Sequence, residues 1–278
     1  MLVKGRDSAQ KSLRSFTRLF SFMSETLINV KNKVAIVTGS AQGIGKATSV
    51  KLIRHGAFVN MIDINSDRLN RVFQDIIEEF PNRANAVCLD VKDFVQVKTF
   101  VDKVIADHSK IDILVNNAGI LRRRSLLEEI PDEEWDLVME VNVKGVFNCT
   151  KAVLPIMKKQ RYGKIVNLSS TAGRSTSELG GAHYTTSKAA VLGLTRHTAR
   201  EAAPYNINVN SICPSLIDTP MVKETTEPEE LERFIREIPM GRMGTVEEAA
   251  NLILFLVSDA SSFVNGATID FTGASLLI

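Results

Sequence analysis

The sequence has few residues of the kinds that build metal sites, disulfides or membrane spans. Its three cysteines, Cys88, Cys149 and Cys213, stand far apart without a C-x-x-C pair, so we interpret them as reduced core residues of an intracellular protein. Its four histidines form no H-E-x-x-H motif, and we therefore expect no protein-bound catalytic metal. A net charge of +2 gives no argument for nucleic acid or a membrane surface as a partner, and no apolar run reaches membrane-spanning length.

Residues 1–22 differ in composition from the rest of the chain. They carry five basic residues and four serines against a single acid, Asp7. That composition is typical of an organelle transit peptide, although a dispensable extension before a second start at Met23 fits equally well. We therefore predict residues 1–30 to be a basic extension, either a targeting segment or disordered. We expect a cytoplasmic protein, with organelle import through residues 1–22 as the alternative.

Strand-like and helix-like segments alternate after this extension. Strands are expected at 33–38, 57–62, 84–89, 111–115, 164–168, 206–212 and 267–271. Helices are expected at 43–55, 67–80, 93–108, 133–160, 182–203, and after the capping box Thr245-x-x-Glu248 to about residue 257. Continuously apolar strands separated by helices indicate a parallel sheet covered on both faces. We predict an α/β fold: one doubly wound Rossmann-type sheet of seven strands over residues 31–278, with the ligand at the carboxyl ends of the strands.

The turn after the first strand, Gly39-x-x-x-Gly43-x-Gly45, favours dinucleotide binding. Glycines let the backbone approach a pyrophosphate, and the N-terminus of the following helix offers free N–H groups. Asp63 closes the second strand, 18 residues after Gly45. A carboxylate there can bind the ribose hydroxyls of NAD and would repel the 2′-phosphate of NADP. Because the residue directly after Asp63 is Ile64 and not an arginine, and Gln42 is uncharged, we predict that NAD(H) is favoured over NADP(H).

A tyrosine and a lysine four residues apart, Tyr184 and Lys188, lie on one face of the predicted helix 182–203. A nearby ammonium favours the phenolate and brings a tyrosine within range of acid/base work at neutral pH. Ser170 ends a strand 14 residues earlier. Asp90 and Asn116-Asn117-Ala118-Gly119 also follow strands, where small and amide side chains suit contacts with adenine and ribose.

Together these motifs resemble the single-domain short-chain dehydrogenases/reductases. The resemblance rests on Thr38-Gly-x-x-x-Gly-Ile-Gly45, Asn116-Asn-Ala-Gly119, Asn142, Ser170 and Tyr184-x-x-x-Lys188, in order and in spacing, and it runs from about Asn32 to the C-terminus. It implies a homotetramer formed through the long helices 133–160 and 182–203.

The resemblance also implies a role for each matching residue. Tyr184 would be the general acid/base, Lys188 would bind the nicotinamide ribose and lower the pKa of the tyrosine, and Ser170 would hydrogen-bond the substrate oxygen. Asn142 would hold a water that links Lys188 to solvent. The residues expected to contact the cofactor are Gly39, Gln42, Gly43, Ile44, Gly45, Asp63, Asp90, Val91, Asn116, Ala118, Gly119, Tyr184, Lys188, Pro214, Ile217 and Thr219.

The sequence departs from the family pattern at Ser215, where a glycine usually follows the proline, and this serine is expected to narrow backbone freedom near the nicotinamide. Segments 171–183 and 221–239 are expected to flank the substrate. The run Arg122-Arg123-Arg124 is either a solvated face or a site for an anionic substrate.

These features predict an NAD(H)-dependent oxidoreductase that interconverts a small or medium secondary alcohol and a ketone by hydride transfer. An alternative is a 3-oxoacyl-(acyl-carrier-protein) reductase, which the segment Ile238-Pro-Met-Gly-Arg-Met-Gly244 and the helix after it resemble. Asp63 argues against that alternative, because those enzymes usually take NADP. A non-catalytic cofactor-sensing protein is a third hypothesis, and the presence of both Tyr184 and Lys188 argues against it.

Overall fold

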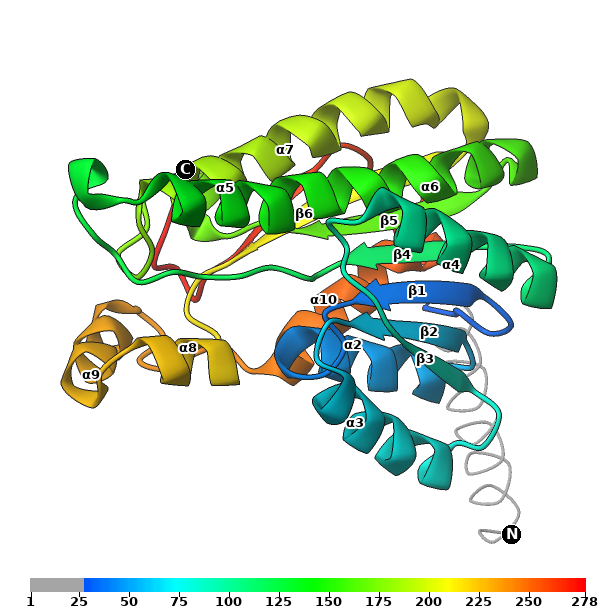
Figure 1. The fold of residues 1–278 in the computed structure, drawn as a ribbon, viewed down its shortest axis with the longest axis horizontal. Helices are drawn as coiled ribbons and strands as arrows, with labels where there is room; N and C mark the ends of the chain where they lie inside the picture. The colour runs from blue at the N-terminus through cyan, green and yellow to red at the C-terminus, as the bar shows by residue number, and fades with distance from the viewer. Residues whose placement is uncertain (1–27) are drawn as a thin grey trace, which may run out of the picture.

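The computed structural model describes residues 28–278, which are built around one parallel sheet (Figure 1). The sheet has seven strands in the order β3-β2-β1-β4-β5-β6-β7, which confirms the predicted doubly wound fold. Its strands are β1 (Val34–Thr38), β2 (Phe58–Asp63), β3 (Ala84–Cys88), β4 (Ile113–Asn116), β5 (Gly163–Leu168), β6 (Ile207–Pro214) and β7 (Thr268–Phe271).

Helices cover both faces of the sheet and create two cores. One core includes side chains of α2, α3 and α10, and the other includes side chains of α4, α6 and α7 (Figure 1). Their bounds are α2 (Gly43–Arg54), α3 (Ser66–Glu79), α4 (Phe94–His108), α6 (Gly145–Gln160), α7 (Ala182–Ala202) and α10 (Val246–Val257). Strand β1 shows why its sequence is apolar throughout: Ala35 and Val37 enter the first core, whereas Val34 and Ile36 enter the second.

The chain reverses its direction of winding at β1. Strand β1 pairs with β2 on one side and with β4 on the other, and both partners are parallel to it. In a doubly wound sheet this switch leaves a crevice beyond the carboxyl ends of the central strands. The turn after β1 and the segment after β4 therefore meet at the place where a ligand is expected.

One long predicted helix differs in the structure. The segment expected as a single helix over 133–160 consists of α5 (Asp132–Met139), a π-helical stretch (Glu140–Lys144) and α6. The wider turn places Asn142 at its centre. Inserted π turns occur often at functional sites, and the spacing of apolar residues did not reveal this one.

Two short helices, α8 (Pro220–Thr225) and α9 (Pro228–Glu237), occupy much of segment 221–239 and project from the sheet (Figure 1). Their apolar side chains form a small cluster of Leu216, Val222, Phe234 and Ile238. This cluster is separate from the two main cores, so α8 and α9 form a wall beside the carboxyl ends of the strands.

Cys149 and Cys213 are buried as predicted, but Cys88 is exposed because β3 is an edge strand, and its assignment to the core was wrong. The predicted basic extension lies outside the described residues, except for its last three positions. Residues 28–278 include no helix with the length and apolar character needed to cross a membrane.

Candidate active site

The glycine-rich turn joins β1 to α2 at one end of the crevice. Gly39 and Gly43 both have positive φ values, +67° and +54°, a conformation that side chains other than glycine rarely adopt. Gln42 stands at the N-cap of α2 without a capping side-chain bond, and the first turn contains no acidic residue. The helix N-terminus is therefore open to an anion.

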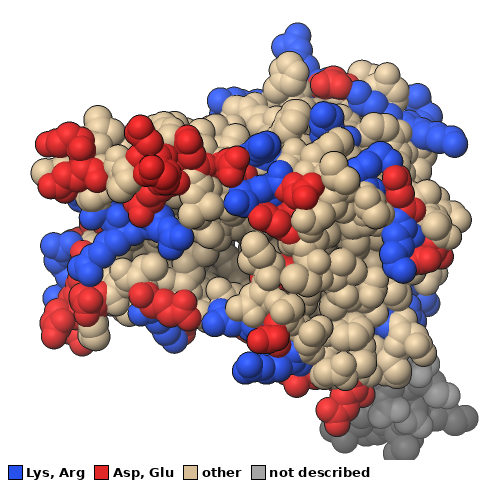
Figure 2. Space-filling model, viewed as in Figure 1, with Lys and Arg blue, Asp and Glu red and all other residues tan. Residues whose placement is uncertain are grey.

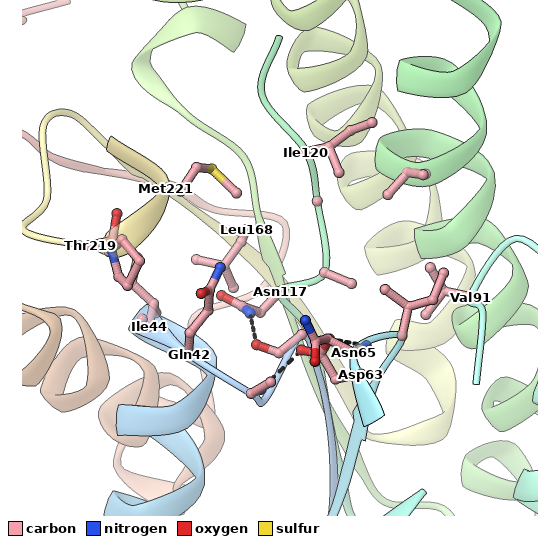
Figure 3. Close-up of a pocket in the computed structure, with 18 of the residues that line it drawn as sticks. Gln42, Ile44, Asp63, Asn65, Val91, Asn117, Ile120, Leu168, Thr219 and Met221 are labelled. Atoms are coloured by element: carbon pink, nitrogen blue, oxygen red, sulfur yellow. Dashed lines mark hydrogen bonds between the residues drawn. The ribbon is translucent and has the colours of Figure 1, made fainter. Parts of the chain in front are cut away.

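Residues directly after β4 hold this turn in shape. The Asn117 side-chain Nδ2 donates hydrogen bonds to the carbonyl oxygens of Thr38 (2.9 Å) and Gly39 (3.0 Å; Figure 3). In return, Thr38 Oγ1 accepts from the backbone N–H groups of Asn117 (3.0 Å) and Ala118 (2.9 Å). Thr38 belongs to the glycine-turn motif and Asn117 to the motif after β4, and the sequence analysis did not predict that these two residues hold the turn.

Asp63 is fixed at the carboxyl end of β2. Its Oδ2 accepts from the backbone N–H of Ala41 at 2.9 Å, and its Oδ1 accepts from the backbone N–H of Asn65 at 2.9 Å (Figure 3). Both carboxylate oxygens are therefore oriented by the backbone of the two turns that border the cavity. The carboxylate retains acceptor capacity for a hydroxyl group.

A cavity of about 500 Å³ connects the glycine turn with the Tyr184 end of the site. Fourteen of the sixteen residues expected at the cofactor line it: Gly39, Gln42, Gly43, Ile44, Asp63, Asp90, Val91, Ala118, Gly119, Tyr184, Lys188, Pro214, Ile217 and Thr219. Among the described residues, the buried Gln42 Oε1 has no hydrogen-bond partner. An elongated polar group with a diphosphate at the α2 N-terminus and a ribose at Asp63 fits this lining, as a nicotinamide dinucleotide requires.

Two residues expected at the cofactor do not line this cavity. The Asn116 side chain is buried in the sheet, where its Nδ2 donates to Asn167 Oδ1 (2.8 Å) and Thr150 Oγ1 (3.2 Å). The Asn116 side chain therefore does not reach the cavity, and a contact between this residue and the cofactor stays a prediction. Gly45 is a packing residue, because a Cβ at this position would lie 2.1 Å from the Gly39 carbonyl oxygen.

Ser170, Tyr184 and Lys188 converge at the other end of the cavity. Ser170 Oγ accepts from the backbone N–H of Ala172 at 3.1 Å, which leaves its hydroxyl proton free to donate. Lys188 Nζ donates to the Leu168 carbonyl at 2.9 Å and lies 5.6 Å from the centroid of the Tyr184 ring. The strand end of β5 and one face of α7 thus bring together a hydroxyl, a phenol and an ammonium.

Burial controls the acid/base properties of this pair. Desolvation raises the pKa of Tyr184, and hydrogen bonding with Ser170 offsets only part of that effect. Desolvation also lowers the pKa of Lys188 to about 8. The expectation that the pKa of the tyrosine is lowered is therefore not met by the chain alone, because the cost of burying a phenolate outweighs the hydrogen bond with Ser170.

Asn142 lies behind this pair and does not line the cavity. Its Oδ1 accepts from the Ile120 backbone N–H (2.8 Å), and its Nδ2 donates to the Ile120 carbonyl (3.0 Å) and to Ser187 Oγ (3.0 Å). A side chain at Gly119 would come within 3.2 Å of Asn142 Oδ1 and 3.4 Å of Lys188 Nζ. Asn142 therefore positions the segment after β4 against α7, beside the lysine.

His183 is a positioning residue that the sequence did not reveal. Its side chain is fully buried, its Nδ1 accepts from the Tyr184 backbone N–H at 2.7 Å, and its Nε2 lies 2.9 Å from Glu134 Oε1. Because Nδ1 accepts, the neutral imidazole carries its proton on Nε2 and donates to Glu134. The start of α7 is thereby tied to α5. In the sequence, the only sign of this role is that His183 directly precedes Tyr184.

The far wall of the cavity follows β6. The Ser215 backbone N–H donates to the Phe271 carbonyl (3.1 Å), and its hydroxyl donates to the Thr272 carbonyl (3.2 Å). The serine at this position therefore ties the end of β6 to the segment after β7. Thr219 caps α8 by accepting from the Val222 N–H at 3.4 Å, so α8 begins at the cavity edge.

The chain is similar to reductases along most of its length. A family model described as enoyl-(acyl carrier protein) reductase matches residues 39–273. A Thermotoga maritima protein named 3-oxoacyl-(acyl-carrier-protein) reductase FabG is 42% identical over 250 residues, which cover 90% of this chain and all of that protein. Oxidoreductase UcpA of Salmonella typhimurium is 38% identical over 88% of this chain and 95% of its own length.

Solved structures agree with these relatives. The crystal structure of levodione reductase superposes with a TM-score of 0.84 at 33% identity, covering 87% of this chain and 97% of that one. The crystal structure of gox2181 superposes with a TM-score of 0.85 at 34% identity, covering 89% of this chain and 96% of that one.

Proposed function

The chain belongs to the short-chain dehydrogenase/reductase family of oxidoreductases, and we propose that it is a ketoreductase that converts a 3-oxoacyl thioester to the 3-hydroxyacyl thioester. The convergence of Ser170, Tyr184 and Lys188 on a cavity that also reaches the glycine turn carries this proposal. The family uses a nicotinamide cofactor, which supplies or accepts the hydride when bound.

The chain's own residues handle the proton and the carbonyl oxygen. Tyr184 donates its phenolic proton to the oxygen of the ketone as the alkoxide forms, and Ser170 donates a hydrogen bond to the same oxygen. Lys188, held by the Leu168 carbonyl, would hold the ribose nearest the nicotinamide and stabilise the phenolate left on Tyr184. Asn142 holds the segment after β4 against α7, and it would hold the water that links Lys188 to solvent. These roles follow from the family resemblance and agree with the contacts described above.

The relatives favour a thioester over the simple secondary alcohol that the sequence analysis put first. Relatives named 3-oxoacyl-(acyl-carrier-protein) reductase come from several organisms and cover nearly the whole chain, including one of Aquifex aeolicus that is 37% identical. A neutral cyclic ketone is the second candidate substrate, because the levodione reductase structure is also similar. A non-catalytic role has no support, because Tyr184 and Lys188 both line the cavity.

For the cofactor, we propose NADH over NADPH. The support is Asp63, whose carboxylate is fixed by two backbone N–H groups at the point where the adenosine ribose is expected. A fixed negative charge there accepts bonds from the ribose hydroxyls and repels a 2′-phosphate. Arg68 also lines the cavity, and a cation there would favour the 2′-phosphate of NADPH. Its guanidinium group lies 3.9 Å from the carboxylate of Glu224, which offsets part of that charge.

Reduction of acetoacetyl thioesters and of neutral ketones, with NADH and NADPH at equal concentration, tests the proposal through nicotinamide absorbance. We expect thioester reduction with NADH to be fastest. Tyr184→Phe should lower kcat by about 10²–10⁴-fold, while cofactor affinity persists. Full activity in that variant would remove Tyr184 from the mechanism, and failure of the parent enzyme on every thioester would overturn the proposed substrate class.

We also propose a homotetramer formed through α7 and the helix pair α5–α6, and a cytoplasmic location or import through residues 1–22. Phe147 on α6 is 45% exposed, as a residue of such an interface would be in a separate subunit. Light scattering tests the first proposal. N-terminal sequencing of the native protein tests the second, because retention of Met1 would exclude cleavage of a targeting segment.

A further inference from the structure

Three consecutive arginines follow β4 and are held close to the start of α7. The Arg124 backbone N–H donates to the Leu179 carbonyl at 2.9 Å, and Arg123 forms an antiparallel bridge with Gly180. A Cβ at Gly180 would lie 2.7 Å from Leu121 Cδ1 and 2.8 Å from Tyr184 Cβ. The arginine segment is therefore packed through Gly180 against the tyrosine.

These arginines line two neighbouring cavities. Arg122 lines the cavity that contains Ser170 and Tyr184. Arg123 and Arg124 line a second cavity of about 380 Å³, whose opposite wall includes Arg233 of α9. Figure 2 shows basic side chains in the hollow at the left of the molecule, with acidic side chains above and below them. We refer to Arg122, Arg123, Arg124 and Arg233 as the arginine cluster.

Most guanidinium groups of this cluster lack an ion-pair partner. Within residues 28–278, only Arg123 has a carboxylate oxygen within 4.0 Å, that of Glu227 at 3.6 Å, and both side chains are 66% exposed. Such a long, exposed pair contributes little and is easily displaced. The second cavity also contains Glu129, Glu178 and Glu230. None of the three lies within ion-pair distance of an arginine of the cluster, so the guanidinium donors stay available.

We propose that the arginine cluster binds the phosphate of a phosphopantetheine thioester while the 3-oxo group lies between Ser170 and Tyr184. Guanidinium groups bind phosphate oxygens through paired N–H donors, and a phosphate can accept from several arginines at once in place of the exposed Glu227 carboxylate. This inference rests on the proposed thioester reductase and names the chemistry that recognises its substrate. Both coenzyme A and a carrier protein present a phosphopantetheine arm, and the substrates compared below distinguish them.

Acetoacetyl-pantetheine and acetoacetyl-phosphopantetheine test the inference, because they share the ketone and thioester and differ only by the phosphate. We expect the parent enzyme to show a kcat/KM at least about tenfold higher for the phosphorylated substrate, which corresponds to about 1.4 kcal/mol. The triple variant Arg123→Gln, Arg124→Gln, Arg233→Gln should lose this preference and retain the activity on acetoacetyl-pantetheine. Arg71→Gln, at an exposed arginine of α3, is the matched control and should behave as the parent.

The possible outcomes distinguish failure of the phosphate site from failure of the proposed reductase activity. Equal rates for the two substrates in the parent enzyme, or an equal fall for both in the triple variant, would overturn the phosphate site and leave the reductase intact. Failure of the parent on both substrates would overturn the proposed function and the site with it. If the triple variant slows acetoacetyl-coenzyme A and the acetoacetyl carrier protein alike, the shared arm is recognised. A loss confined to the carrier protein would indicate protein docking and contradict the phosphate site.

Discussion

Gly45 provides a sharp test of how the cofactor turn is built. Alanine is favoured over glycine within a helix by about 0.5–1 kcal/mol, so Gly→Ala in α2 would ordinarily stabilise the protein. Here the added Cβ would lie 2.1 Å from the Gly39 carbonyl oxygen and 2.5 Å from Asn117 Nδ2. Both atoms belong to the group that holds the turn, because Asn117 Nδ2 donates to Thr38 and Gly39.

The expected size of the effect follows from these contacts. Overpacking costs about 1–3 kcal/mol, and displacement of an Asn117 hydrogen bond costs about 0.5–1.5 kcal/mol more. After the gain in helix propensity is subtracted, Gly45→Ala should lower the free energy of unfolding by about 0.5–4 kcal/mol. Because the N-terminus of α2 must move away from Gly39, the affinity for the dinucleotide should also fall by at least about tenfold.

Gly193 is the matched control, because it lies within α7 and a Cβ there would meet no atom within 4 Å. Gly193→Ala should stabilise the fold by about 0.5–1 kcal/mol, and each kcal/mol corresponds to about 2–4 °C in Tm for a domain near this size. Urea denaturation and calorimetric titration with NADH would measure both variants. Equal stabilisation by the two substitutions, or unchanged affinity in Gly45→Ala, would refute the reasoning.

Three further predictions follow from the site. His183→Ala should lower the free energy of unfolding by at least about 1.5–3 kcal/mol in urea denaturation, because it removes a buried hydrogen bond to the Glu134 carboxylate. Lys188→Met should abolish activity yet stabilise the fold at pH 7. Since burial lowers the pKa of Lys188 to about 8, the buried ammonium destabilises the folded state fully below pH 8, and this cost disappears between pH 8 and the unfolded value of about 10.4. Thermal melts at pH 7 and pH 10 should therefore show the advantage of the variant shrinking, and a constant advantage would contradict the assigned cause. Asp63→Asn should raise the ratio of NADPH to NADH efficiency by about tenfold or more, and an unchanged ratio would remove Asp63 as the selective residue.

The sequence was sufficient for the fold because each strand–helix unit carries a local signal. In β1, consecutive apolar residues enter opposite cores, so an unbroken apolar run indicates a central parallel strand. The glycine turn was equally clear, since Gly39 and Gly43 have positive φ values. The π turn at Asn142 was not visible, because one inserted residue in a long helix barely changes the spacing of apolar positions.

The sequence was less informative about which strand-end side chains face the ligand. Asn116 and Asn117 are neighbours, yet the first pairs with Asn167 on the adjacent strand and the second holds the glycine turn. Neighbouring strand residues point to opposite faces, so a shift of one residue in the strand end exchanges the two roles. The positioning role of His183 was missed for another reason. That role depends on a hydrogen bond with Glu134 in α5, which is distant in sequence.

The raised pKa of Tyr184 bears on which proton form the site offers to a substrate. The site holds the phenol in an environment where burial outweighs the stabilising hydrogen bond from Ser170, so the chain alone keeps the tyrosine protonated at neutral pH. A protonated phenol is the form required to donate to a ketone oxygen, whereas oxidation of an alcohol requires the phenolate. Lys188, fixed by the Leu168 carbonyl with its pKa near 8, lies where it stabilises the phenolate only after that proton has been transferred. The site therefore offers a ketone the protonated phenol that a reductase requires, as in the reductases that this chain resembles, whereas the substrate and the cofactor set the equilibrium between ketone and alcohol.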